Sequence, residues 1–163
     1  MSKRVRNEHE GPADVQRVFA VLTSEDFAAC KAERFGDDSR IVRREEAPDG
    51  GVTVVVSREL PAGVPGFLQR FLPKDGRVVE THVWGPEQDG ARRGTWSADI
   101  AGAPARLGGT MSLTPTASGG CRHVIEGEVS VRVPVVGGKA ESFIAEMVEK
   151  LSQKEAELLT TQV

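Results

Sequence analysis

The sequence has few cysteines and no long apolar run, and each absence excludes a class of protein. Cys30 and Cys121 lie far apart and outside any CxxC pair, so neither a disulfide framework nor a zinc site is expected. No apolar run approaches the roughly 20 residues that cross a bilayer. The amino-terminal MSKRVRNEHE alternates charge where a secretory signal has an apolar block. We therefore expect a cytoplasmic protein without an integral membrane segment.

The chain also lacks an excess of positive charge and the motifs of common catalytic sites. Its net charge is −3, whereas non-specific binding to nucleic acid requires a basic face. There is no nucleophile elbow, no Walker phosphate loop and no metal spacing among the three histidines. We expect no nucleic-acid partner, no metal and no cofactor, and the catalytic residues, if any, stay unknown.

Length and patterning indicate one domain over residues 1–163, either a monomer or a homodimer. Residues 3–10 alternate strictly, which predicts a strand with Asn7 and His9 facing inward. Two short helices are expected within residues 11–36. Pro12 suits the first helical position, and Thr23 is expected to cap the second helix with Asp26 as capping-box partner.

From residue 39 to residue 133, apolar and polar residues alternate with a period of two, and turn sequences interrupt the alternation. APDGG at 47–51 predicts a hairpin between the charged strand 39–47 and the apolar strand 51–60. Further strands are expected near 76–85, 92–101, 105–114 and 121–133, which gives seven strands with the first.

Alternation also assigns side chains to the two faces of these strands. Trp96, Met111 and His123 fall on inner faces. On strand 76–85 the pattern favours Val79, Thr81 and Val83 inside and Glu80 and His82 outside.

A long amphipathic helix follows the strands. About 22 residues give a rod of roughly 33 Å, enough to cross a small sheet. We expect the helix to cover the inner sheet face and to enclose a cavity. Its apolar stripe, interrupted only by Glu155, comprises Ala140, Phe143, Ile144, Met147, Leu151 and Leu158.

Two stretches resemble a known superfamily. GPADVQRVFAVLTSEDF (11–27) resembles the first helix, and its connection, of the helix-grip superfamily, which includes START lipid-transfer domains, polyketide cyclases and the birch-pollen-allergen group. VPVVGGKAESFIAEMVEKL (133–151) resembles an uncharacterised bacterial branch, a domain of unknown function that is DUF2505-like. The resemblance spans essentially the whole chain. It implies an α+β helix-grip fold: a curved seven-stranded antiparallel sheet wrapped around a long C-terminal helix, with two short helices between the first two strands.

The insertion at 61–73 is longer than a tight turn, and its apolar residues predict a short helix within 64–72. This helix either packs on the rim as ordinary core or gates the cavity.

Three functions stay open. The leading one is binding of a hydrophobic small molecule, such as a lipid or a polyketide-like ring compound. The second is a cyclase, dehydratase or hydrolase that uses His9 or His123 as acid or base, with Asn7 or Thr81 positioning the substrate. The third is a protein-interaction module through residues 64–72. The residues expected to line the cavity are Asn7, His9, Phe67, Phe71, Thr81, Trp96, Met111, His123, Phe143, Met147 and Leu151.

Overall fold

The computed structural model describes residues 2–60 and 63–163. The seven strands are β1 (Lys3–Gly11), β2 (Arg40–Glu46), β3 (Val52–Glu59), β4 (Arg77–Trp84), β5 (Arg92–Ile100), β6 (Ala105–Pro115) and β7 (Cys121–Val131). The helices are α1 (Val15–Leu22), α2 (Glu25–Phe35), α3 (Gly66–Gln69) and α4 (Gly137–Gln162). This order of elements confirms the predicted α+β helix-grip fold.

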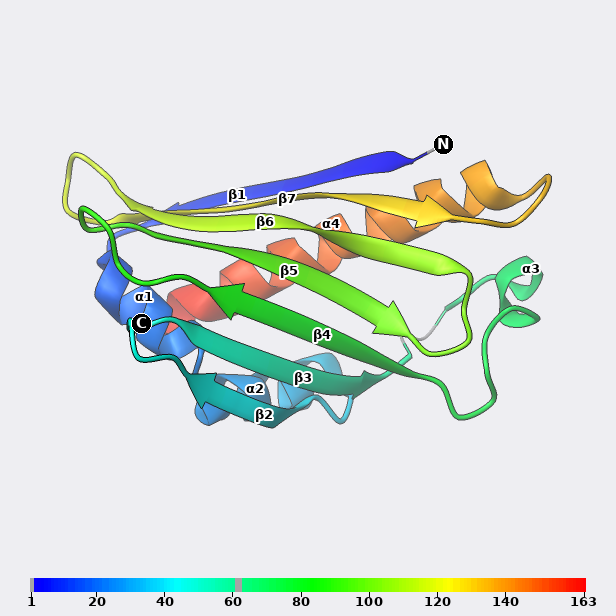
Figure 1. The fold of residues 1–163 in the computed structure, drawn as a ribbon, viewed down its shortest axis with the longest axis horizontal. Coiled ribbons are helices and arrows are strands. Elements are labelled where there is room, and N and C mark those ends of the chain that lie inside the picture. The colour runs from blue at the N-terminus through cyan, green and yellow to red at the C-terminus, as the bar shows by residue number, and fades with distance from the viewer. Residues whose placement is uncertain (1, 61–62) are drawn as a thin grey trace.

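All strand pairs are antiparallel, and the sheet order is β1-β7-β6-β5-β4-β3-β2. Figure 1 shows α4 crossing one face of the curved sheet obliquely, with α1 and α2 on the same side of the sheet. With 26 residues, α4 is about 39 Å long and reaches from one end of the sheet to the other. The inner face of the sheet is therefore the face that α4 covers.

The caps of the two short helices differ from the prediction. Asp14 caps α1 by accepting a hydrogen bond from the Arg17 amide at 2.8 Å, so Pro12 lies before the helix. Ser24, not Thr23, caps α2 and accepts from the Phe27 amide at 3.1 Å. Thr23 ends α1 instead. Its backbone still follows α1, whereas Ser24 has the extended backbone that an N-cap requires.

The inner face of β4 was predicted wrongly. Residues directly opposite in an antiparallel pair share a face, and Val56, Val54 and Val52 of β3 lie opposite Glu80, His82 and Trp84. The three valines are buried, so β4 turns its alternate set, with Glu80 and His82, inward. Val79 and Val83 are exposed, and Thr81 lies on the outer face between them.

The core divides into two clusters at opposite ends of α4. The larger one joins α1, α2 and the sheet to Leu158 and Leu159 near the helix C-terminus. The smaller one joins Val5 and Val129 to Ala145 near the helix N-terminus. The middle turns of α4 therefore face a part of the sheet that neither cluster fills.

The predicted helix in the insertion is shorter than expected. α3 covers only Gly66–Gln69, and residues 61–62 of the insertion lie outside the described residues. Figure 1 places α3 beyond the end of the strands, away from α1 and α2.

Candidate functional site

A cavity of about 140 Å³ lies between the sheet and the middle of α4. Five strands, β3 to β7, form its floor, and α2 and α4 close it from above. Most of its wall is apolar. The apolar side chains include Val54, Val56, Val78, Trp84, Trp96, Ala98, Leu107, Met111, Ile125, Ile144, Met147, Val148 and Leu151.

A larger groove of about 810 Å³ adjoins this cavity. It runs between the end of α2, the end of β3 and the length of α4, and about half of the residues that line it are charged. Arg58, Met147 and Leu151 line both the groove and the cavity. These three side chains therefore lie at the boundary between the groove and the cavity.

A glycine of β7 makes room for an indole on the cavity floor. Gly109 and Gly127 lie opposite each other on β6 and β7, beside Trp96 of β5. A Cβ atom at Gly127 would come within 2.7 Å of the Trp96 ring. The Trp96 Nε1–H donates to the carbonyl of Glu126 at 3.0 Å, so the ring lies across the two neighbouring strands.

The cavity also contains a chain of charged side chains from β3 and β4. Arg58 Nη2 lies 2.6 Å from Glu80 Oε1, and His82 Nε2 lies 3.4 Å from Glu80 Oε2. The Arg58 and Glu80 side chains are only 19% and 18% exposed, so solvent screens this pair weakly. Burial alone would raise the pKa of Glu80, but the charge of Arg58 and the hydrogen bond from His82 lower it well below its usual range.

A second ion pair closes the cavity from the helix side. Lys31 of α2 lies 3.5 Å from Glu155 of α4, and their side chains are 12% and 26% exposed. Lys31 also lies over the ring of Phe27. Glu155, the residue that interrupts the apolar stripe of α4, thus faces the cavity and pairs with a cation there.

His123 of β7 is the third polar element of the cavity. Burial lowers its pKa to about 4, although the charge of Glu155 acts in the opposite direction. Its imidazole is therefore neutral at pH 7, with one nitrogen as donor and the other as acceptor. No hydrogen bond joins either ring nitrogen to another of the described residues.

Five of the predicted cavity residues line the cavity: Trp96, Met111, His123, Met147 and Leu151. Phe143 lines the groove.

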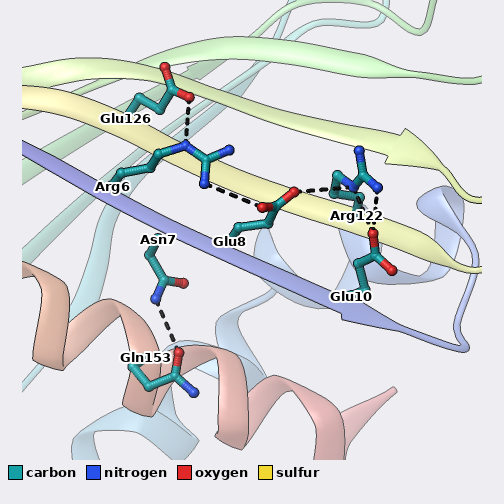
Figure 2. A network of polar contacts seen from close by, with 7 residues as sticks. All are labelled: Arg6, Asn7, Glu8, Glu10, Arg122, Glu126 and Gln153. Atoms are coloured by element: carbon teal, nitrogen blue, oxygen red, sulfur yellow. Dashed lines mark hydrogen bonds and ion pairs between the residues drawn. The ribbon is translucent and has the colours of Figure 1, made fainter.

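The side chains of Asn7 and His9 face α4 and form hydrogen bonds with it. Asn7 Nδ2 donates to Gln153 Oε1 at 3.1 Å, and His9 Nε2 lies 3.1 Å from the Thr160 hydroxyl. Figure 2 shows the Asn7 contact below β1 and, on the other side of the strand, a row of ion pairs. That row, which joins β1 to β7, comprises Arg6, Glu8, Glu10, Arg122 and Glu126. Asn7 and His9 thus tie β1 to the helix and do not line the cavity.

The remaining predicted residues lie elsewhere. Thr81 is on the outer sheet face, for the reason of strand pairing given above. Phe67, in α3, and Phe71, just after it, are half-buried, with Lys139 over the ring of Phe67 and Arg70 over that of Phe71. Leu68 is buried. The described residues of 64–72 therefore form neither a cavity wall nor the exposed apolar patch that a protein-interaction module needs.

Five polar residues that line the cavity were not predicted to do so: Lys31, Arg58, Glu80, His82 and Glu155. Two signals pointed to them. Arg58 lies on the same face of β3 as Val54 and Val56. Strand pairing places Glu80 opposite Val56 and His82 opposite Val54, so these two residues of β4 lie on that face as well. Glu155 is a single charge on an otherwise apolar helix stripe.

Over the described residues, no group of three or more His, Cys, Asp or Glu side chains is placed to hold a metal ion. No helix among these residues is long and apolar enough to cross a membrane.

Solved structures with the same architecture show that the chain has the helix-grip fold. A protein from Thermus thermophilus superposes with a TM-score of 0.65 at 20% identity, over 98% of this chain and 99% of that one. A norcoclaurine synthase from Thalictrum flavum, in complex with dopamine and hydroxybenzaldehyde, superposes with a TM-score of 0.59 at 17% identity, over 99% of this chain and 88% of that one.

The chain belongs to the family described as "Protein of unknown function (DUF2505)", which matches residues 6–163. An uncharacterised protein of Mycobacterium tuberculosis is 30% identical over 141 residues, which are 85% of this chain and 77% of the relative.

The buried position of His123 predicts a specific pH dependence of stability. A histidine whose pKa falls from 6.5 to about 4 on folding binds more protons in the unfolded state, so stability rises with pH between these values. When the pH is lowered from 7 to 5, this residue should therefore reduce the free energy of unfolding by about 2 kcal/mol. Urea unfolding of His123→Leu at the two pH values should therefore show a smaller loss than wild type.

Ile125→Val, on the same face of the same strand, is the matched control for this measurement. It changes packing without removing a titrating group, so it should keep the wild-type pH dependence. If His123→Leu lost as much stability as wild type between pH 7 and pH 5, the buried neutral imidazole would be contradicted.

Proposed function

We propose that the protein binds a hydrophobic small molecule in the cavity between the sheet and α4. The observation that carries this proposal is the space itself: the middle turns of α4 face an apolar cavity that the two core clusters leave open. Close-packed interiors have few voids of this size, and a void costs stability. A space left open between rigid elements is typical of a ligand site.

The two adjoining spaces suggest how a ligand is held. An apolar cavity of this volume accommodates about one aromatic ring. The rest of a larger molecule would extend past Arg58, Met147 and Leu151 into the groove. The complex of the structurally similar norcoclaurine synthase with dopamine and hydroxybenzaldehyde supports a ligand of one or two small rings.

Filling the cavity should abolish binding without unfolding the protein. Ala98 of β5 is buried and lines the cavity, so Ala98→Leu places a larger apolar side chain in the open space. We expect the affinity for an uncharged fluorescent probe, N-phenyl-1-naphthylamine, to fall by at least about tenfold, while the free energy of unfolding changes by less than about 1 kcal/mol.

Ser97→Leu adds a side chain of the same size one residue away, on the outer face of β5, and should leave probe affinity unchanged. Native mass spectrometry of the purified protein gives an independent measurement of a bound molecule. A wild-type protein that carries no ligand and shows no saturable binding of the probe would remove the support for this function.

A second candidate is an acid–base enzyme that uses a cavity histidine. The neutral imidazole of His123 and the contact between His82 and Glu80 favour it, whereas the placement of His9 and Thr81 does not. A histidine base would take a proton from the carbon next to the carbonyl of a bound ketone, and a deuteron from solvent would replace that proton. Deuterium exchange into 2-tetralone, followed by NMR, should then be faster than in buffer and slower with His82→Gln or His123→Gln. Equal rates with and without protein would count against catalysis.

A further inference from the structure

The charged groups of the cavity neutralise one another. Among the described residues that line it, Arg58 is paired with Glu80 and Lys31 with Glu155. His123 is held neutral and adds no charge to this balance, and His82 contacts the carboxylate of Glu80. An anionic ligand would meet no unpaired cation there and would lie beside two carboxylates.

The same groups leave hydrogen-bonding capacity unused. The Nε–H of Arg58 is buried and has no hydrogen-bond partner among the described residues. His82 uses Nε2 toward Glu80, which leaves Nδ1, and both nitrogens of His123 are unpaired within the described chain. Buried polar groups are normally satisfied, so the Arg58 Nε–H favours a ligand that brings a polar atom of its own, and the free histidine nitrogens could bind the same atom.

The charged and histidine side chains of the cavity also lie where an entering ligand would contact them. Arg58 lines both the groove and the cavity, so a molecule that enters from the groove passes it. The charge of Lys31 acts on Glu80, and those of Glu155 and His82 act on His123, which places the ionisable groups within one another's electrostatic range. The remaining wall is apolar and suits the hydrocarbon part of the same molecule.

We propose that the cavity selects an uncharged, oxygen-bearing aromatic molecule, with a carbonyl or hydroxyl oxygen that accepts from the Arg58 Nε–H and hydrogen-bonds to the cavity histidines. This inference rests on the proposed binding function and narrows its ligand class. A ligand whose carboxylate lies inside the cavity is disfavoured on this account, because the described cavity residues offer that charge no free cation.

Three probes of nearly equal shape separate these possibilities: 2-acetylnaphthalene, 2-naphthoate and 2-isopropylnaphthalene. Each is titrated against protein loaded with N-phenyl-1-naphthylamine at pH 7. In the wild-type protein we expect 2-acetylnaphthalene to displace the dye at a concentration at least about tenfold lower than 2-naphthoate. The isopropyl compound measures what the hydrocarbon alone contributes.

The paired variant Arg58→Met, Glu80→Leu removes the cluster without leaving one charge unpartnered. In this variant the ratio of the affinities for the acetyl and the isopropyl probe should fall by about fivefold relative to wild type. The exposed pair Arg6 and Glu126, replaced in the same way, is the matched control and should leave the preference unchanged.

The outcomes distinguish the two proposals. Binding of 2-naphthoate as tight as that of 2-acetylnaphthalene would overturn the inference in favour of an anion site. An acetyl preference that survives in the paired variant would overturn the role of Arg58 and Glu80. Absence of dye binding by the wild-type protein would instead contradict the proposed function itself.

Discussion

Removal of residues 139–163 should leave a chain that is insoluble or molten rather than a smaller folded protein. α4 buries Leu158 and Leu159 and half-buries Ile144, Met147, Val148 and Leu151. The two buried side chains contribute about 1.5 to 3 kcal/mol each and the four half-buried ones roughly half as much, so their total of about 6 to 12 kcal/mol is comparable with the whole stability of a typical domain. Without the helix, the part of the inner sheet face that α4 covers, above all on β1 and β7, would be open to water. Near-ultraviolet circular dichroism and thermal melting of the truncated chain test this expectation.

Substitutions within the full-length chain show whether the effect comes from the buried stripe. Leu158→Asp with Leu159→Asp places two charges in the larger core cluster and should also abolish cooperative melting. Glu149→Gln with Lys150→Gln alters two exposed residues of the same helix and should melt close to wild type. A truncated chain that melts cooperatively at the full-length temperature would contradict the architecture.

Replacing Glu80 alone should be among the most destabilising single changes in the sheet. Glu80→Leu leaves the Arg58 guanidinium in the cavity without its 2.6 Å partner. Breaking a buried ion pair on one side costs about 3 to 5 kcal/mol, because the remaining charge is uncompensated. Urea unfolding at pH 7 should show a loss of about 3 kcal/mol.

The paired variant Arg58→Met, Glu80→Leu should recover most of that loss and lie within about 1 kcal/mol of wild type. Glu126→Leu is the matched control, because Glu126 pairs with Arg6 at 3.0 Å but both side chains are 54% exposed. An exposed pair contributes about 1 kcal/mol or less. If Glu80→Leu cost no more than Glu126→Leu, the cluster would be solvated and would not act as the polar end of a closed cavity.

The fold could be predicted because local signals and the global architecture agree. The APDGG turn closes the β2–β3 hairpin through hydrogen bonds between Ala47 and both Gly50 and Gly51. Predicted and observed strands differ by one or two residues at their ends. The apolar stripe predicted α4 and placed Met147 and Leu151 on the covered side, where the structure has them.

The polar part of the site could not be found from one strand at a time. β4 has two adjacent valines, Val78 and Val79, so alternation alone fits either face. The choice depends on pairing with β3, whose buried valines carry Glu80 and His82 inward. A sequence pattern assigns apolar residues to the interior and charged residues to the surface. Arg58 and Glu80 are exceptions, because they neutralise each other and can therefore lie inside.

Asn7 and His9 were not expected to contact α4, for a different reason: the position of the helix on the sheet could not be predicted. Their inward direction followed from strict alternation and is what the structure has. Which inward residues line open space depends on where α4 crosses the sheet, and it crosses directly over this strand. A crossing angle is a property of packing between distant segments, which one sequence does not display.

The central claim is that a small hydrophobic molecule enters between the sheet and α4. Two of the chain's three methionines report on this space from opposite sides, since Met111 lies on the floor and Met147 in the helix wall. NMR of protein labelled with ¹³C at the methionine methyl groups, titrated with 2-acetylnaphthalene, is the most direct measurement, and Met111→Leu and Met147→Leu assign the signals. The account predicts that both signals shift together and saturate at one ligand per chain, and that Ala98→Leu suppresses both shifts. Ligand binding that leaves the Met111 and Met147 signals unmoved would contradict it.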